Sequence, residues 1–286
     1  PDWGRVVISH STKIRGSIKP RFIRRRINNV CLISLVFIAM LGLSGCITET
    51  TGAIQQAPDP VKQVKAYVDL GVGYVQNGEF ARAKDNLNKA LEIDSDSADA
   101  HHVFGRLFQL EGEYALAEDH YKKALASEPE LTRARMTYGA FLYTEGRYEE
   151  AERELSIAAD DRLYQMRAQV FEYLGMTYTK LNQPREAELA YLRATQLNPN
   201  QARALLELSE IRFDQRNYVE ARNYYRKSLK VAAPSSRSLW LCIRLARIFS
   251  DDDQEASCSL TLRNVFPASE EYKLYQSVAS KNARRS

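Results

Sequence analysis

Residues 133–155, RARMTYGAFLYTEGRYEEAEREL, contain the pattern that decides the fold of this chain. The pair Tyr138-Gly139 lies in an apolar stretch with helical spacing, and Ala151 lies in a second such stretch twelve residues after the glycine. Between the two stretches lies the turn sequence EGR, residues 145–147. The segment therefore predicts two helices joined by a short turn.

This pattern recurs four more times, with spacings of 34, 34, 36 and 34 residues between rows. Each row has a small residue in the first helix and an alanine twelve residues later in the second: Gly71 and Ala83, Gly105 and Ala117, Gly139 and Ala151, Gly175 and Ala187, Ser209 and Ala221. Such rows match the tetratricopeptide pattern, in which each repeat is an antiparallel helix pair and stacked repeats share one core. With a degenerate unit after the fifth row, the sequence predicts an all-α fold, a right-handed α-α superhelix (solenoid) of about six tetratricopeptide repeats.

The domain organisation follows from the repeat. Residues 1–20 are an upstream segment of doubtful status, because no methionine precedes Met40 and both a non-Met start codon and translated upstream sequence remain open. The other predicted parts are a signal peptide at 21–45, a tether at 46–63, a repeat array at 64–272 and a helix end and tail at 273–286. The predicted repeat units are 64–97, 98–131, 132–167, 168–201, 202–235 and 236–272.

The segment before the array has the plan of a secretory signal. Four arginines between residues 21 and 26 precede an apolar run of fourteen residues, Val30 to Leu43, and small residues precede Cys46. A permanent bilayer span needs roughly 20 apolar residues, so the run is short for one. The ending LSGC at 43–46 resembles the bacterial lipobox, which implies cleavage before Cys46 and acylation of that cysteine, palmitate included. The alternative is a plain signal peptide or short anchor with an incidental cysteine.

The charge distribution argues against nucleic acid as a partner. The chain has a net charge of +4, but residues 1–45 hold eight basic side chains and one acid, a net of +7, so the remainder carries −3. Binding of nucleic acid needs lysine and arginine clustered on the folded surface. We therefore expect no nucleic-acid partner.

The chain also lacks patterns that indicate catalysis. Outside the leader its histidines are His101, His102 and His120, and no acid–histidine–nucleophile or metal-ligand spacing surrounds them. No phosphate-binding loop, nucleophile elbow or zinc-protease motif occurs. We therefore expect no enzyme activity, no metal, no cofactor and no small-molecule substrate.

Two cysteines fall in the degenerate sixth unit. Cys242 lies ten residues before Asp252, taken as the centre of an acidic turn, and Cys258 lies six residues after it. On antiparallel helices a mismatch of four residues is about 6 Å along the axis, added to about 8–10 Å between axes. That separation exceeds the roughly 7 Å limit between Cα atoms for a disulfide. The expectation is therefore two buried free thiols.

The resemblance to tetratricopeptide proteins implies that the first helix of each repeat lines an inner groove for a polypeptide. It assigns this groove to Val68, Val72, Val75, His102, Arg106, Gln109, Arg133, Met136 and Tyr143, and in later repeats to Glu172, Met176, Lys180, Arg203, Leu206 and Phe213. The three valines are expected to form an exposed apolar stripe, which typically marks an interaction site. The alternative is that the tether, residues 48–60, folds back over them.

Two stretches point to a narrower family. Residues 133–155, quoted above, and the sixth unit, with WLCIRLAR at 240–247 and NVFPASEEY at 264–272, resemble the PilF/PilW family of type IV pilus biogenesis lipoproteins. The resemblance covers about Leu43 to Tyr272, and only the sixth unit is specific for this family.

What the resemblance implies is a pilotin that acts in twitching motility. It would be lipid-anchored on the periplasmic face of the outer membrane through Cys46, would bind the secretin subunit of the pilus through the repeat groove, and would promote its localisation and multimerisation. The runner-up is a lipoprotein scaffold for another envelope machine, either outer-membrane protein assembly or peptidoglycan remodelling. A cytosolic peptide-binding adaptor also remains open if the leader is not used.

Overall fold

The computed structural model describes residues 59–283, and every regular element in that range is an α-helix. The helices are α2 (Pro60–Gln76), α3 (Phe80–Ile93), α4 (Ala98–Glu111), α5 (Tyr114–Ser127), α6 (Thr132–Thr144), α7 (Tyr148–Asp160), α8 (Arg167–Lys180), α9 (Pro184–Leu197), α10 (Ala202–Asp214), α11 (Tyr218–Val231), α12 (Ser236–Phe249), α13 (Asp252–Val265) and α14 (Glu270–Ala283). The all-α expectation is confirmed. No helix from α2 to α14 combines the length and apolar character needed to cross a bilayer.

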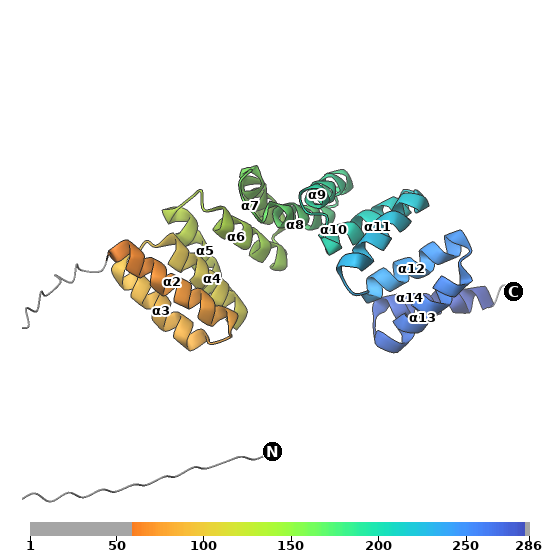
Figure 1. Cartoon of the computed structure of the whole chain (residues 1–286), viewed down its shortest axis with the longest axis horizontal. Helices are drawn as coiled ribbons and strands as arrows, with labels where there is room; N and C mark the ends of the chain where they lie inside the picture. The colour runs from red at the N-terminus through yellow and green to blue at the C-terminus, as the bar shows by residue number, and fades with distance from the viewer. Residues whose placement is uncertain (1–58, 284–286) are drawn as a thin grey trace, which may run out of the picture. The chain divides into compact units, whose positions relative to one another are not determined.

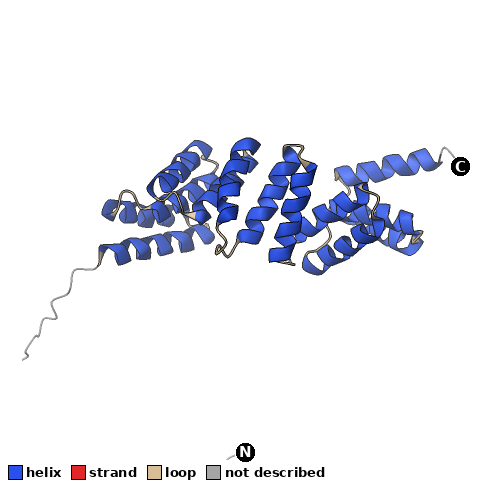
Figure 2. Ribbon diagram, turned by 90° about the horizontal axis from the view of Figure 1, so that it is seen from above, coloured by secondary structure: helices blue, strands red, loops and turns tan. Residues whose placement is uncertain are grey.

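The first twelve of these helices form six antiparallel pairs, which follow one another along a curved array (Figure 1). The first helices of neighbouring pairs contact each other, from α2 and α4 through to α10 and α12. Each second helix contacts its own first helix and the first helix of the next pair. The even-numbered helices α2 to α12 therefore form a continuous surface, here called the inner wall. The view from above shows the same succession of pairs, with α14 at the end (Figure 2).

Small residues let the two helices of a pair approach closely. A Cβ atom added to Gly105 of α4 would lie 2.7 Å from Cδ1 of Tyr121 on α5, and one added to Gly175 of α8 would lie 2.5 Å from Cε1 of Tyr191 on α9. In the fifth pair Ser209 is tolerated because its hydroxyl donates to the carbonyl oxygen of Ala221 at 2.7 Å. The bulky ring of one helix thus fills the space above the glycine of the other.

The turns inside the pairs need a left-handed backbone conformation. Gly78, Gly112 and Gly146 have φ values of 75°, 82° and 76°, and Gly146 belongs to the turn sequence EGR from which the third turn was predicted. In the next three pairs the positive-φ residue is Asn182, Arg216 or Ser250, with φ of 56°, 63° and 53°. The turn geometry is retained there without glycine. For Arg216 this positive φ is a strained backbone conformation.

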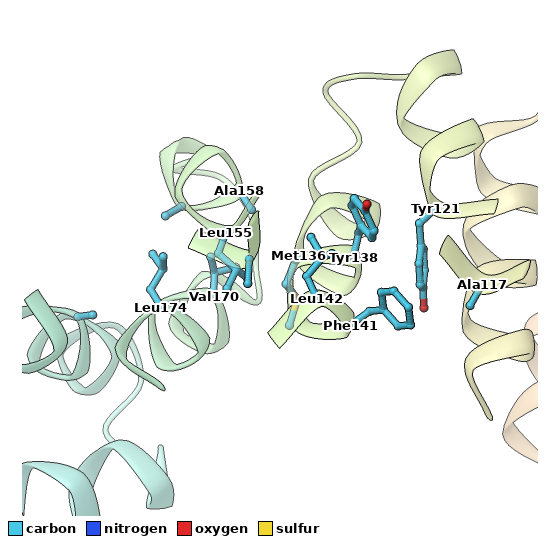
Figure 3. Packing of buried hydrophobic residues seen from close by; sticks show 13 residues of the cluster. Ala117, Tyr121, Met136, Tyr138, Phe141, Leu142, Leu155, Ala158, Val170 and Leu174 are labelled. Atoms are coloured by element: carbon cyan, nitrogen blue, oxygen red, sulfur yellow. The ribbon is translucent and has the colours of Figure 1, made fainter. Parts of the chain in front are cut away.

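The core continues from each pair into the next. Tyr121 of α5 lies against Phe141 of α6, with ring centroids 5.6 Å apart, and both side chains are essentially fully buried. Figure 3 shows this cluster extending to Leu155 of α7 and Leu174 of α8. Because the shared apolar layer lies between pairs, no single pair could bury its own apolar face.

The sixth pair corrects one expectation. Cys242 of α12 and Cys258 of α13 form a disulfide with Cα atoms 6.3 Å apart, so the prediction of two free thiols is wrong. Since α12 ends at Phe249 and α13 begins at Asp252, the turn is centred before Asp252, and the two cysteines lie at nearly equal distances from it. In addition, Cα atoms on the facing sides of two helices each lie about 2.3 Å nearer to the partner helix than their own helix axis does. The Cα atoms of the two cysteines are therefore closer together than the full distance between helix axes predicts.

The last helix packs against the array. Tyr272 and Tyr275 of α14 contact the core of the sixth pair, and the guanidinium of Arg247 lies 5.9 Å from the centroid of the Tyr275 ring. One side of α14 therefore covers the end of α12 and α13, while most of its other residues are exposed.

Candidate functional site

The predicted valine stripe of α2 is mostly buried. Val68 and Val75 are only 6% and 5% exposed, and Val72 is half-buried beside them. They pack in one cluster with Val103 and Leu107 of α4. The expectation of an exposed stripe on α2 is therefore wrong, because stacking of α4 on α2 covers the face that was thought free.

Predicted groove residues of the second and third repeats are also interior. His102 of α4 is 6% exposed, and its Nε2 donates to Oγ1 of Thr137 on α6 at 3.2 Å, while that hydroxyl donates to the carbonyl oxygen of Arg133. Met136 of α6 is equally buried, and its sulfur accepts a hydrogen bond from the Tyr164 hydroxyl at 3.4 Å. Both side chains hold neighbouring repeats together instead of facing a groove.

Met176 of α8 is likewise buried, in a core cluster with Tyr191 and Leu208, whereas the other predicted residues reach the surface of the inner wall. Arg106, Gln109 and Tyr143 are half-buried and Arg133 is exposed. Gln109 accepts a hydrogen bond from the Tyr121 hydroxyl at 2.8 Å, and Arg133 forms an ion pair with Asp99 on α4. The wall therefore presents polar groups that are already held in place, Gln109 by its own repeat and Arg133 by the preceding one.

A cavity of about 380 Å³ opens at the start of the array, where α2, α3 and α4 meet. Its apolar side consists of Val61, Val64 and Val68, with Ile93 opposite. Val61 is 77% exposed and Ile93 is 38% exposed, so much of this lining is open to solvent. Its polar lining residues are Lys65, Asp94, Ser97 and Asp99.

This cavity shows what the repeat alignment missed. Of the residues that the repeat alignment assigned to the groove, Val68 lines this cavity together with Lys65 and Asp99, which the same alignment placed beside and within the groove. Val64 and Val61 extend the same helical spacing by one and two turns toward the N-terminus, and this was the available signal. The predicted array began at residue 64, whereas α2 begins at Pro60 with Asp59 as its cap, and Val61 was assigned to the tether.

The far half of the inner wall is tied together by charges. Arg237 of α12 donates to Glu207 and Glu210 of α10 at distances between 2.5 and 2.7 Å. Burial raises the pKa of Glu210 above its usual value, although hydrogen bonding to Arg237 opposes this shift. Next to them Arg244 lies 4.5 Å from the centroid of the Phe213 ring. These contacts fix the relative position of the fifth and sixth pairs.

The histidines of the second repeat are structural. Nε2 of His101 donates to the carbonyl oxygen of Ser95 at 3.1 Å, which leaves its Nδ1 to accept from Nδ1 of His120 at 3.0 Å. Burial, then the neighbouring His101, lowers the pKa of His120 to about 4. Within residues 59–283 no group of three or more histidine, cysteine or acidic side chains is arranged to hold a metal ion.

Several predictions lie outside the described residues. They are the upstream segment 1–20, the signal peptide 21–45, the acylated Cys46 and the tether as far as residue 58.

Comparison with known proteins assigns the repeats. One tetratricopeptide repeat family model matches residues 68–127 and 174–237, and a second matches residues 108–169. The type IV pilus assembly protein PilF of Pseudomonas aeruginosa is 41% identical over 250 residues, which cover 85% of this chain and 97% of that protein.

Solved structures agree with this relationship. A structure of Pseudomonas aeruginosa PilF superimposes with a TM-score of 0.74 at 42% identity and covers 76% of this chain and 98% of its own. PilW, a widely conserved type IV pilus biogenesis factor, superimposes with a TM-score of 0.64 and covers 74% of this chain and 98% of its own. PilW is 21% identical, so this second likeness concerns the fold alone.

Proposed function

Because this chain belongs to the PilF/PilW family of tetratricopeptide proteins in type IV pilus biogenesis, we propose that it acts as a pilotin, an outer-membrane lipoprotein for the pilus secretin. In this proposal it binds the secretin subunit, promotes its localisation and multimerisation in the outer membrane, and carries no catalytic activity.

The observation that carries the binding step is the cavity between α2, α3 and α4. Its volume of about 380 Å³ lies within the roughly 300–1,000 Å³ of ordinary ligand sites. Exposed Val61 and Ile93 offer apolar surface, while Asp94 and Asp99 offer acceptors for backbone or side-chain N–H groups. We infer that an apolar side chain of the secretin subunit occupies this cavity and that its polypeptide continues along the inner wall.

The proposed location depends on Cys46. An acylated Cys46 would confine the array to the periplasmic face of the outer membrane and raise its effective concentration toward a secretin segment at the same membrane. The disulfide between Cys242 and Cys258 supports export, because disulfides persist in oxidising compartments such as the periplasm.

The binding site can be tested with one substitution and a matched control. Val61→Glu places a charge at the mouth of the cavity, at the second residue of α2, where the side chain is 77% exposed. Val219→Glu makes the same change at the second residue of α11, where the side chain is 59% exposed. Each variant is expressed in a strain that lacks the gene. Complementation is scored by the amount of heat-stable secretin multimer and by twitching motility.

We expect Val61→Glu to lose most of the multimer and the motility at normal protein levels, and Val219→Glu to keep both. Equal behaviour of the two variants would remove the cavity from the proposal. Co-purification tests the partner: a secretin band supports the pilotin role, whereas barrel-assembly components or peptidoglycan hydrolases in its place favour a scaffold for another envelope machine.

The anchor is tested separately with Cys46→Ala. Loss of palmitate incorporation is expected, together with release of the array from the outer-membrane fraction. Continued labelling would exclude Cys46 as the acylated residue.

A further inference from the structure

A second cavity lies on the opposite side of the array from the inner wall. It has a volume of about 510 Å³ and lies between the second helices of the fourth and fifth pairs, α9 and α11. Leu192 of α9, Leu205 of α10 and Tyr224 and Val231 of α11 form its apolar lining. Leu205 is only 2% exposed, so the floor of this outer cavity is set well below the surface.

The rim of the outer cavity is basic. Lys227 and Lys230 of α11 line it, and both side chains are exposed. The Nζ atom of Lys227 lies 5.4 Å from the centroid of the Tyr224 ring, which holds the ammonium at the edge of the apolar lining. Exposed Arg226 lies on the same helix and Arg193 on the facing helix.

Among residues 59–283, Lys227 and Lys230 have no acidic partners, in contrast to the lysines at the middle of α5. On α5, Lys122 and Lys123 form ion pairs with Glu118 and Asp119, four residues earlier, at 2.8 and 2.7 Å. The residues four positions before Lys227 and Lys230 are Asn223 and Arg226. Within the described part of the chain neither lysine forms an ion pair, so their charges are free for another molecule.

From this juxtaposition we propose that the outer cavity binds an acidic segment of a partner protein, with an apolar side chain in the cavity and carboxylates at Lys227 and Lys230. The unpaired lysines supply charge complementarity, which favours encounter with an anionic partner and fixes its orientation. The recessed floor distinguishes a polypeptide from a membrane, because a flat layer of lipid headgroups would reach the lysines but not Leu205.

This site does not rest on the proposed binding of secretin. It uses the face formed by α9 and α11, whereas the proposed pilotin site uses α2, α3 and α4. Val61→Glu should therefore leave it unchanged.

The test measures binding of a fluorescein-labelled octapeptide, composed of aspartate and glutamate with one central phenylalanine, to the full chain by fluorescence anisotropy. Lys227→Glu/Lys230→Glu should weaken binding at least tenfold, and binding to the unmodified protein should fall as salt is raised. The control is Lys89→Glu on α3, which occupies the same repeat position as Lys227, is exposed and lies near the ring of Tyr67. It should change binding less than twofold.

A second peptide with asparagine and glutamine in place of the acids should bind at least tenfold more weakly. Unchanged thermal unfolding of both variants establishes that the fold is intact, as expected for exposed side chains. Sedimentation with vesicles of phosphatidylcholine and phosphatidylglycerol tests the alternative that the lysines bind a membrane surface. The proposal is overturned if neither peptide binds, if the charge reversal leaves peptide affinity unchanged, or if the lysines affect vesicle binding alone.

Discussion

At the scale of single residues, the array depends on positions where a side chain has no room. Gly105 lies inside α4, where glycine ordinarily costs about 0.5–1 kcal/mol relative to alanine. The Tyr121 ring opposite is fully buried and its hydroxyl is bonded to Gln109, so the ring cannot move aside. Gly73 of α2 is also a helical glycine, but no atom lies within 4 Å of an added Cβ.

These two glycines give opposite expectations. Gly105→Ala should lower the free energy of unfolding by about 1–3 kcal/mol, because an extra methyl group in a packed core forces its neighbours apart. Gly73→Ala should leave it unchanged or raise it by up to about 1 kcal/mol through its better helix propensity. Urea denaturation followed by circular dichroism measures both. A loss of the same size in Gly73→Ala would show that close packing is not the cause.

His102 makes stability depend on pH. Its burial, with a smaller effect of Arg106, lowers the pKa of the ring to about 4 from 6.5. On acidification the unfolded chain therefore binds this proton first. The stabilisation from the neutral ring is complete above about pH 6.5 and is lost as the pH falls toward 4.

The shift corresponds to roughly 3 kcal/mol at 1.36 kcal/mol for each pKa unit. Between pH 7.5 and pH 4 the free energy of unfolding of the unmodified protein should fall. In His102→Gln this fall should be smaller by about that amount. Denaturant titrations at both pH values measure the difference, and the value at pH 7.5 gives separately any packing loss from the substitution. An unchanged pH dependence would mean that His102 does not titrate in this range.

At the scale of elements, the sixth pair is the one whose two helices are covalently joined. The disulfide closes a sequence separation of 16 residues and lies in the core with Leu241 and Leu262. Since this pair ends the row of repeats, α14 covers it in place of a further repeat. The cross-link and α14 together stabilise an end that has a repeat on one side only.

Breaking the cross-link should loosen this pair. Loop closure over about 15 residues predicts a loss of about 3 kcal/mol on reduction or in Cys242→Ala/Cys258→Ala. Thermal unfolding with and without reductant measures it, and reductant should have no effect on the double variant. Alkylation of the denatured, unreduced protein should label neither cysteine. Labelling of both would contradict the disulfide.

At the scale of the whole array, contacts join each pair only to its neighbours in the sequence. Stability is then approximately a sum of terms for single repeats and for adjacent interfaces. The effect of a substitution at one end on stability should therefore decrease with each successive repeat. The proposed site on α2 to α4 and the outer cavity on α9 to α11 are expected to respond independently to substitution.

Removal of α14 tests this property. A chain ending at Ala268 uncovers the apolar surface of α12 and α13 that Tyr272 and Tyr275 contact. Native-state hydrogen exchange should quicken in those two helices by tenfold or more and remain within twofold in α2 to α5. A uniform loss of protection from α2 to α13 would instead indicate that the array unfolds as a single cooperative unit.

The fold was predictable because a repeat supplies several independent observations of one unit. Rows such as Gly105 with Ala117 place the close approach of two helices, and Gly78, Gly112 and Gly146 place the turns. The binding surface was less predictable. Val68 and His102 were assigned to a groove, but their burial depends on how far one repeat rotates against the next, and spacing along one helix carries no such information.

The amino-acid sequence alone determined the helix pairs, their stacking and the family, since these depend on which residues are small, bulky or turn-forming at a fixed period. Tertiary structure decided which surfaces remain open. It buried Val75 behind α4, opened one cavity at Val61 and another beside Lys227, and brought Cys242 within bonding distance of Cys258. The physical reason is that exposure and bonding distance depend on the packing of helices against each other, where an offset of one residue shifts a side chain by about 1.5 Å along the axis and by about 100° around it.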